Sequence, residues 1–212
     1  MQYKGMCDIM KEERYNLASI TKKIYESGFY FFKIMTLKDI LEIKKESTLF
    51  SVVRKLVRAG VLTKIEKNKY VLKSAKVSDF ALANFLYSPS YISFESALNF
   101  YGILSQFPYE ISSATPKKSV QKEFEEKIFT YTKIKSELFW GYEKIENFLI
   151  ALPEKALLDQ IYLVAKGQKN INLDEIDLSK ISVSTFKKFL NMYPRTRQFL
   201  KMIKKLKEIH LI

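Results

Sequence analysis

Residues 47–72 read STLFSVVRKLVRAGVLTKIEKNKYVL and decide the fold of the N-terminal part of the chain. The first half predicts a helix with one apolar face, because its apolar residues recur at helical spacing. These residues are Leu49, Val52, Val53 and Leu56. The pattern ends at Gly60, and glycine suits a helix C-terminus. Two strand-like runs, 61–65 and 70–72, then flank a tight polar segment at 66–69, so a β-hairpin is expected.

Two further helices are expected upstream of this stretch. The first begins near Leu17 and stops before Gly28, again with apolar residues at helical spacing. An aromatic run at 29–32 follows, and Thr36 is the expected N-cap of a short second helix. Ser47 is the expected N-cap of the third helix. Three helices followed by a hairpin form the order of a winged helix-turn-helix.

The outward face of the third helix is suited to DNA. With the apolar stripe turned inward, the opposite face presents Ser47, Ser51, Arg54, Lys55 and Arg58. Arginine can donate twice to guanine in the major groove, while lysine and serine can reach bases or phosphates. Ser47 and Thr48 also lie at the helix N-terminus, where free N–H groups favour a phosphate. These residues are therefore the expected DNA contacts.

The hairpin tip adds a second expected contact with DNA, along the backbone or in the minor groove. Its polar residues are Lys64, Lys67, Asn68 and Lys69. Two alternatives stay open. A basic helix face can be solvated without any nucleic-acid function, and winged domains also serve as protein-interaction modules.

Charge is spread unevenly along the 212-residue chain, whose net charge is +13. Residues 1–76 carry 17 Lys and Arg against 8 Asp and Glu, and residues 77–183 carry 11 against 14. Residues 184–212 carry 8 against 1. The basic ends favour a polyanionic partner, although an ordinary solvated surface can have the same composition.

A second domain is expected over residues 77–212, following a DNA-binding domain over residues 1–76. Helices are expected at 80–87, from a cap at Ser93 to about Gly102, and at 154–164 after Pro153. Two basic amphipathic helices are expected near the C-terminus, at 184–192 and 194–209. Strand-like segments at 110–115, 129–134 and 148–152 are compatible with one antiparallel sheet. The expected fold class is mixed α/β (α+β) with a small antiparallel sheet.

Several segments of this second domain stand out as motifs. They are NFLYSPSYISFESAL at 84–98 with YGIL at 101–104, YEISSATPKK at 109–118, FWGY at 139–142 and ALPEKALLD at 151–159. Together they resemble the AbiEi-type antitoxin family of bacterial abortive-infection systems, over about residues 30–165. The resemblance implies a winged N-terminal domain, an α/β antitoxin domain and a neighbouring gene for a nucleotidyltransferase-like toxin.

The resemblance also implies autoregulation, in which the antitoxin binds inverted repeats in promoter DNA and represses its own operon. Basic residues of the C-terminal domain are implied to assist by contacting the DNA backbone. In this sequence the matching candidates are Lys187, Lys188, Arg195, Arg197, Lys201, Lys204 and Lys205. A solvated face or a membrane-surface helix are the alternatives for this basic segment.

No cofactor, metal or enzyme activity is expected. The single cysteine, Cys7, and the single histidine, His210, leave too few ligands for an ordinary zinc site. No glycine pair has the spacing of a phosphate-binding loop, and one histidine removes most acid–base schemes. Hydroxyls beside two lysines suggest a nucleophile, but they are equally normal on a half-exposed strand. These residues are Ser112, Ser113, Thr115, Lys117 and Lys118.

The sequence leaves two functional hypotheses. The first is an antitoxin that also represses transcription. Its expected location is the cytoplasm, since no apolar run approaches the roughly 20 residues that span a bilayer. The second is a winged protein-interaction module that neutralises its partner by direct binding without specific DNA recognition. In that case an aromatic set would contact the toxin. Its members are Tyr87, Tyr91, Phe139, Trp140 and Tyr142.

Overall fold

A computed structural model describes residues 16–106 and 108–210 of the chain. The chain divides into two compact units, unit 1 through Val77 and unit 2 from Ser78. This division lies next to the boundary expected after Lys76. The chain is mixed α/β, as the sequence predicts, and its small antiparallel sheet lies in unit 1.

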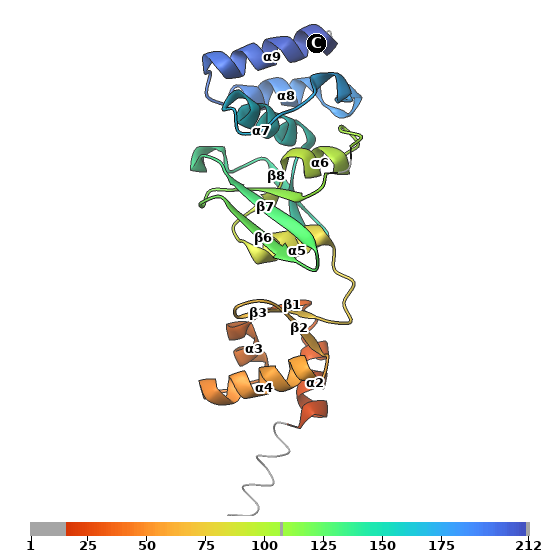
Figure 1. Cartoon of the computed structure of the whole chain (residues 1–212), viewed down its shortest axis with the longest axis vertical. Coiled ribbons are helices and arrows are strands. Elements are labelled where there is room, and N and C mark those ends of the chain that lie inside the picture. The colour runs from red at the N-terminus through yellow and green to blue at the C-terminus, as the bar shows by residue number, and fades with distance from the viewer. Residues whose placement is uncertain (1–15, 107, 211–212) are drawn as a thin grey trace, which may run out of the picture. The chain divides into compact units, whose positions relative to one another are not determined.

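Unit 1 has the element order of a winged helix-turn-helix (Figure 1). Its elements are α2 (Leu17–Glu26), β1 (Phe31–Lys33), α3 (Ile34–Ile40), α4 (Glu46–Arg58), β2 (Leu62–Glu66) and β3 (Lys69–Leu72). The three strands form an antiparallel sheet in the order β1-β3-β2. The helices lie together on one side of this sheet, and the buried faces of helices and strands form one apolar core.

The apolar stripe of α4 is buried in that core, as predicted: its four residues are at most 3% exposed. The predicted N-caps are wrong, however. The helix α3 begins at Ile34 and α4 begins at Glu46, and neither has a side-chain cap. Tertiary contacts fix the start of α3, because the Ile34 N–H donates to the carbonyl of Asn68 at 2.9 Å. Thr36 and Ser47 consequently lie inside the first turns of their helices.

The hairpin turns more tightly than the sequence suggests. Its strands extend to Glu66 and from Lys69, so Lys67 and Asn68 alone form the turn. Asn68 has a φ of 61°, and asparagine tolerates this left-handed conformation better than most residues. The turn therefore projects Lys67 at its tip.

Unit 2 surrounds a six-stranded sheet with helices. Its strands are β4 (Tyr91–Ile92), β5 (Ile111–Thr115), β6 (Val120–Phe124), β7 (Lys127–Lys133), β8 (Tyr142–Ile145) and β9 (Phe148–Ala151). Its helices are α5 (Asp79–Leu86), α6 (Phe94–Phe100), α7 (Pro153–Ala165), α8 (Val183–Leu190) and α9 (Arg197–His210), with short 3-10 helices η1 (Ser136–Leu138), η2 (Leu173–Glu175) and η3 (Leu178–Lys180).

The three predicted strands of unit 2 lie in one sheet, but this sheet is mixed rather than antiparallel. The strand order is β6-β7-β5-β4-β9-β8, and the pairs β5–β7 and β4–β9 are parallel. The two-residue strand β4 joins the halves of the sheet. The strands of these two pairs run parallel because a long connection, rather than a hairpin, joins them along the chain.

Helices cover both faces of this sheet (Figure 1). On one face Tyr131 of β7 donates its hydroxyl to the carbonyl of Ala83 in α5 at 2.6 Å. On the other face Tyr91 of β4 donates to Asp159 in α7 at 2.9 Å. The helices α8 and α9 pack against α7. None of the helices, as far as the structure describes them, is long and apolar enough to cross a membrane.

Candidate nucleic-acid interface

The predicted DNA-contacting face of α4 is exposed along its length. Ser47, Ser51, Arg54, Lys55 and Arg58 are all exposed, whereas the apolar stripe is in the core. The two arginines and the lysine form no ion pair with any other described residue. Their charge is therefore available to a ligand from outside the unit.

The N-terminus of α4 is open in the same way. Its N-cap residue, Lys45, makes no side-chain cap bond, and Ser47 is exposed while Thr48 is half-buried. The N–H groups of a first helical turn have no partner within the helix, so they remain available to an anion. This arrangement fits the predicted phosphate contact.

Two lysines of the hairpin have no ion-pair partner among the described residues, and a third is engaged. Lys64 and Lys67 are exposed, and Asn68 is half-buried. Lys69 differs, because its Nζ lies 3.0 Å from the Glu66 carboxylate and its side chain is 22% exposed. Lys69 therefore neutralises Glu66, and Lys64 and Lys67 are the better candidates for DNA contact.

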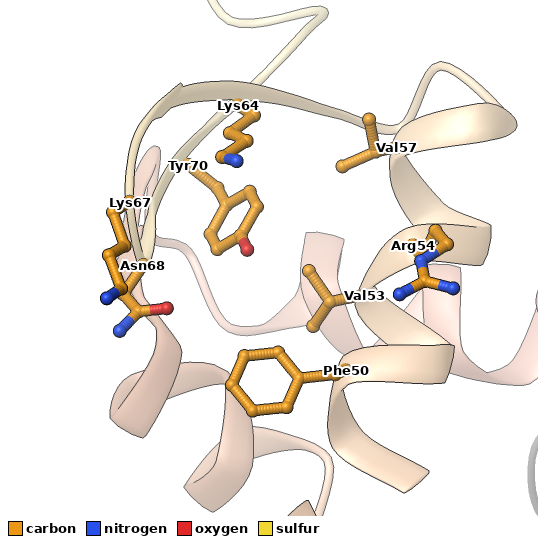
Figure 2. Close-up of a pocket in the computed structure, with 8 residues that line it drawn as sticks. All are labelled: Phe50, Val53, Arg54, Val57, Lys64, Lys67, Asn68 and Tyr70. Atoms are coloured by element: carbon orange, nitrogen blue, oxygen red, sulfur yellow. The ribbon is translucent and has the colours of Figure 1, made fainter. Parts of the chain in front are cut away.

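A hollow of about 290 Å³ lies between α4 and the hairpin (Figure 2). Its polar lining is Arg54 from the helix with Lys64, Lys67 and Asn68 from the hairpin. Its apolar lining is Phe50, Val53, Val57 and Tyr70. Partial burial raises the pKa of Tyr70, so its phenol is neutral at physiological pH. The hollow is thus an apolar floor with a cationic rim.

Sequence reasoning missed Phe50 in this surface. The residue sits next to the buried stripe on the helical wheel, yet it is 43% exposed and lines the hollow. The available signal was its position one turn before Arg54, which puts both residues on one side of α4. The helix face is therefore not purely polar.

The C-terminal cations also lie outside the core. Along α9 the residues Phe199, Ile203 and Leu206 are buried, while Arg197, Lys201 and the remaining cations of the predicted set are exposed. Two members of that set are engaged with neighbours. The Arg195 guanidinium donates to the Asn191 Oδ1 at 2.9 Å, and the Lys204 Nζ lies 3.5 Å from Glu208. Lys187 and Lys188, on α8, are exposed.

Comparison with known proteins supports the fold. The chain is similar to the crystal structure of the RV2827C protein from Mycobacterium tuberculosis, with a TM-score of 0.62 and 15% sequence identity. The similarity covers 91% of this chain and 76% of that one, so it includes both units. No protein-family model and no curated protein matches the sequence.

In unit 2 the sequence motifs converge on a buried ion pair. Lys155 and Asp159, one turn apart in α7, are both 0% exposed and form a salt bridge. The Lys155 Nζ also donates to the hydroxyls of Tyr91 at 3.0 Å and Tyr193 at 2.8 Å. Asp159 accepts further bonds from Tyr91, Ser93 and Tyr193 at 2.7–2.9 Å. Tyr91, Ser93, Lys155 and Asp159 all come from the motif segments, and together with Tyr193 they satisfy one buried charge pair and form the Lys155–Asp159 cluster.

The cluster corrects two sequence-based interpretations and contains one residue that sequence reasoning missed. Ser93 does not cap α6 with its side chain, because its hydroxyl donates to Asp159 instead. Tyr91 is fully buried and is unavailable as a toxin contact. Lys155 was missed, since a lysine is rarely found fully buried.

Alkaline pH is expected to destabilise the chain. Burial and the negative charge of Asp159 raise the pKa of Tyr91 and Tyr193 well above 10. The folded state therefore retains both phenolic protons after the unfolded chain has lost them. Their contribution to the free energy of unfolding is fully present below pH 10 and is lost as the pH rises above it. Burial lowers the pKa of Lys155, so this group makes the free energy of unfolding rise with pH. That effect ends at 10.5, the pKa of lysine in the unfolded chain.

Tyrosinate absorbance during a pH titration checks this expectation. The buried phenols should titrate together with a loss of helical circular dichroism above pH 10.5, after the exposed tyrosines. Full ionisation of all 13 tyrosines in a chain that remains folded would contradict it.

Gly141 packs directly against the Lys155 stem. It has a φ of +70°, and a Cβ there would lie 3.1 Å from both Cγ and Cδ of Lys155. Gly167 has a φ of +68° with no atom within 4 Å of such a Cβ, so it provides a matched control. Alanine at positive φ costs about 1 to 3 kcal/mol at either position, and Gly141→Ala should cost more because of the added clash. Urea denaturation measures both, and equal losses would contradict the packing role.

The hydroxyls considered as nucleophiles are mostly engaged with the backbone. Ser112 donates to the carbonyl of Ser93 at 2.9 Å, and Thr115 donates to that of Pro89 at 2.8 Å. The Lys117 Nζ donates to the carbonyl of Ser88 at 2.6 Å. Among the side chains that the structure describes, no group of three His, Cys, Asp or Glu is arranged to hold a metal ion. Cys7 lies outside the described residues.

Proposed function

We propose that this protein is a sequence-specific DNA-binding repressor that also acts as the antitoxin of a bacterial toxin–antitoxin system. The observation that carries the DNA-binding part is the outward face of α4. Arg54, Lys55 and Arg58 are exposed there without an ion-pair partner among the described residues, beside a basic hairpin. A cationic helix of 13 residues fits the major groove of B-DNA.

In this proposal each part of unit 1 has a separate role. Arg54, Lys55 and Ser51 contact base edges, while the open N-terminus of α4 with Ser47 and Thr48 holds a phosphate. Lys64, Lys67 and Asn68 contact the backbone or the minor groove next to the helix. Exposed cations of α8 and α9 add backbone contacts that raise affinity without adding specificity. Bound at inverted repeats in its own promoter, the protein represses its operon.

The antitoxin part of the proposal is supported by the sequence resemblance of unit 2. The segments that carry this resemblance supply Tyr91, Ser93, Lys155 and Asp159, which interact with one another in one buried cluster. Two of the resembling segments, 84–98 and 151–159, therefore meet in one buried cluster. The proposed functional partner is a nucleotidyltransferase-like toxin encoded beside this protein, and the proposed location is the cytoplasm.

Binding measurements test the DNA-binding part. The full-length protein should bind the DNA upstream of its own gene at least about 1,000-fold more tightly than unrelated DNA of the same length at physiological salt. Both affinities should fall as salt rises, because phosphate contacts release counterions. Equal affinities for the two duplexes, with the same salt dependence, would contradict specific recognition.

Growth assays test the antitoxin part. Expression of the adjacent toxin gene alone should arrest growth, and coexpression of this protein should restore it. A neighbouring gene without toxicity, or toxicity that this protein does not relieve, would contradict the antitoxin proposal while leaving DNA binding untouched.

A second candidate function is direct neutralisation of a partner protein by unit 1. It is favoured by large apolar side chains that are exposed within residues 25–35, outside α4. These are Tyr25, Phe29, Tyr30 and Met35. Protein-binding surfaces are typically rich in exposed large apolar residues, and these four lie close together along the chain. If this function holds without DNA recognition, the toxin will copurify with the protein and the upstream DNA will not be preferred.

A further inference from the structure

Phe50 is an apolar side chain that α4 holds outside the core. It is 43% exposed, whereas the four residues of the apolar stripe are at most 3% exposed. The stripe residues already anchor α4, so Phe50 is not needed to fix the helix. Leaving an aromatic ring in water forgoes about 25 cal/mol for each Å² of apolar surface that burial would remove. A ring in this position therefore favours an external apolar contact.

Polar groups surround this ring on the helix. Ser47 precedes Phe50 by three residues, Ser51 follows it directly, and Arg54 lies four residues after it. All three are exposed. Figure 2 shows the Phe50 ring on the side of α4 that faces the hairpin, in the hollow that Arg54 and Lys64 also line. The ring thus lies beside exposed hydrogen-bond donors of α4, at the edge of the apolar floor that Val53, Val57 and Tyr70 form in the hollow.

DNA offers a matching apolar point in its major groove. Among the four bases, thymine alone presents a methyl group there, at C5, and apolar side chains including phenylalanine contact it. Phosphates and the other base edges present polar or charged groups, which a phenyl ring does not satisfy. The chemistry of the ring therefore selects thymine over cytosine at the same position.

We propose that Phe50 is a specificity-determining residue that contacts the C5 methyl group of a thymine in the bound DNA. The proposal rests on the function proposed above, in which α4 enters the major groove. It adds a base preference at a position that the arginines and serines of α4 do not define. Burial of one methyl-sized group corresponds to about a four-fold change in affinity.

The test uses thymine and uracil, which differ only by this methyl group. A duplex is first selected from a random-sequence pool by its binding to the full-length protein. Each thymine of the selected duplex is then replaced by uracil, one at a time. Affinities are measured for the wild type, for Phe50→Ala and for Phe29→Ala. Phe29 is a matched control in unit 1, because it is 54% exposed and lies outside α4.

Binding by the wild type should weaken about four-fold when uracil replaces one particular thymine in each half-site. Phe50→Ala should bind the thymine duplex at least that much more weakly and should no longer distinguish thymine from uracil there. Its circular dichroism and the salt dependence of its binding should match the wild type, because neither the core nor a charge has changed. Phe29→Ala should keep the full wild-type pattern.

Two results would overturn the proposal while leaving the proposed function intact. In the first, no single uracil weakens binding by the wild type. In the second, Phe50→Ala keeps the same thymine-to-uracil ratio as the wild type. If the pool yields no preferred duplex at all, specific DNA recognition itself fails, and the role of Phe50 fails with it.

Discussion

Replacement of Arg54, Lys55 and Arg58 together by alanine is expected to abolish specific DNA binding. Each well-formed contact of this kind is worth about 1 to 3 kcal/mol, so affinity for the preferred duplex should fall at least about 100-fold. The slope of binding against salt should also become shallower, by about 0.9 for each phosphate that the variant no longer neutralises. Folding should be unaffected, because all three side chains are exposed and have no ion-pair partner among the described residues.

A charge-matched variant separates this effect from a general loss of positive charge. Lys118, Lys144 and Lys180 are exposed in unit 2, and their replacement by alanine removes the same net charge. This control should retain the preference for the specific duplex. If both triple variants weaken binding equally, α4 is not the recognition element. If protection from the toxin survives in the α4 variant, repression and protection depend on different surfaces.

Replacement of Asp159 by alanine is expected to destabilise unit 2 strongly. Asp159 accepts bonds from Lys155, Tyr91, Ser93 and Tyr193, and the substitution leaves the Lys155 charge buried without its counterion. Removal of one partner from a buried pair costs about 3 to 5 kcal/mol. Trp140, the one tryptophan of the chain, lies with its ring 5.0 Å from the Lys155 Nζ, so its fluorescence during urea denaturation reports on this region.

Glu208→Ala provides the matched control for this prediction. Glu208 and Lys204 have the same spacing in a helix as Asp159 and Lys155, but both are exposed. Exposed pairs contribute little to stability, so the urea midpoint of Glu208→Ala should stay at the wild-type value. A midpoint for Asp159→Ala that also matches the wild type would show that the Lys155–Asp159 cluster does not stabilise unit 2.

Local patterns predicted unit 1 well because its helices have strong apolar periodicity. The stripe of α4 is followed directly by a hairpin, and short-range order of this kind is visible in sequence. Helix starts were less accessible. The chain enters α3 from β1, which has three residues and no visible alternation, and the Asn68 carbonyl holds Ile34 from a distant part of the chain.

Unit 2 was harder to predict because its organisation depends on long-range pairing. Five-residue segments such as β5 show strand composition but do not reveal whether their partner runs parallel. The two-residue β4 carries almost no local signal, although it links β5 to β9. Lys155 and Asp159 of α7 are four residues apart in the sequence, the spacing of two neighbours on one face of a helix. Its burial depends on Tyr91 and Tyr193, which are far away along the chain.

Part of the candidate DNA interface was predictable from the sequence, and part of it was not. Helical periodicity identified the exposed cations of α4, because one buried stripe determines the opposite face. It did not identify the hollow shared with the hairpin, since that requires the fold to bring α4 and β2 together. Likewise the ion pair that engages Lys69 arises from the tight turn after Glu66.

Cross-linking from α4 tests the central claim most directly. A photoreactive amino acid is introduced at Ser51, an exposed residue on the outward face of α4, and separately at Ser179, an exposed residue of η3. Each protein is bound to the preferred duplex and irradiated. We expect the probe at Ser51 to form adducts with bases inside the protected site, and the probe at Ser179 to form none with bases. Specific binding without base adducts from Ser51 would contradict recognition by α4.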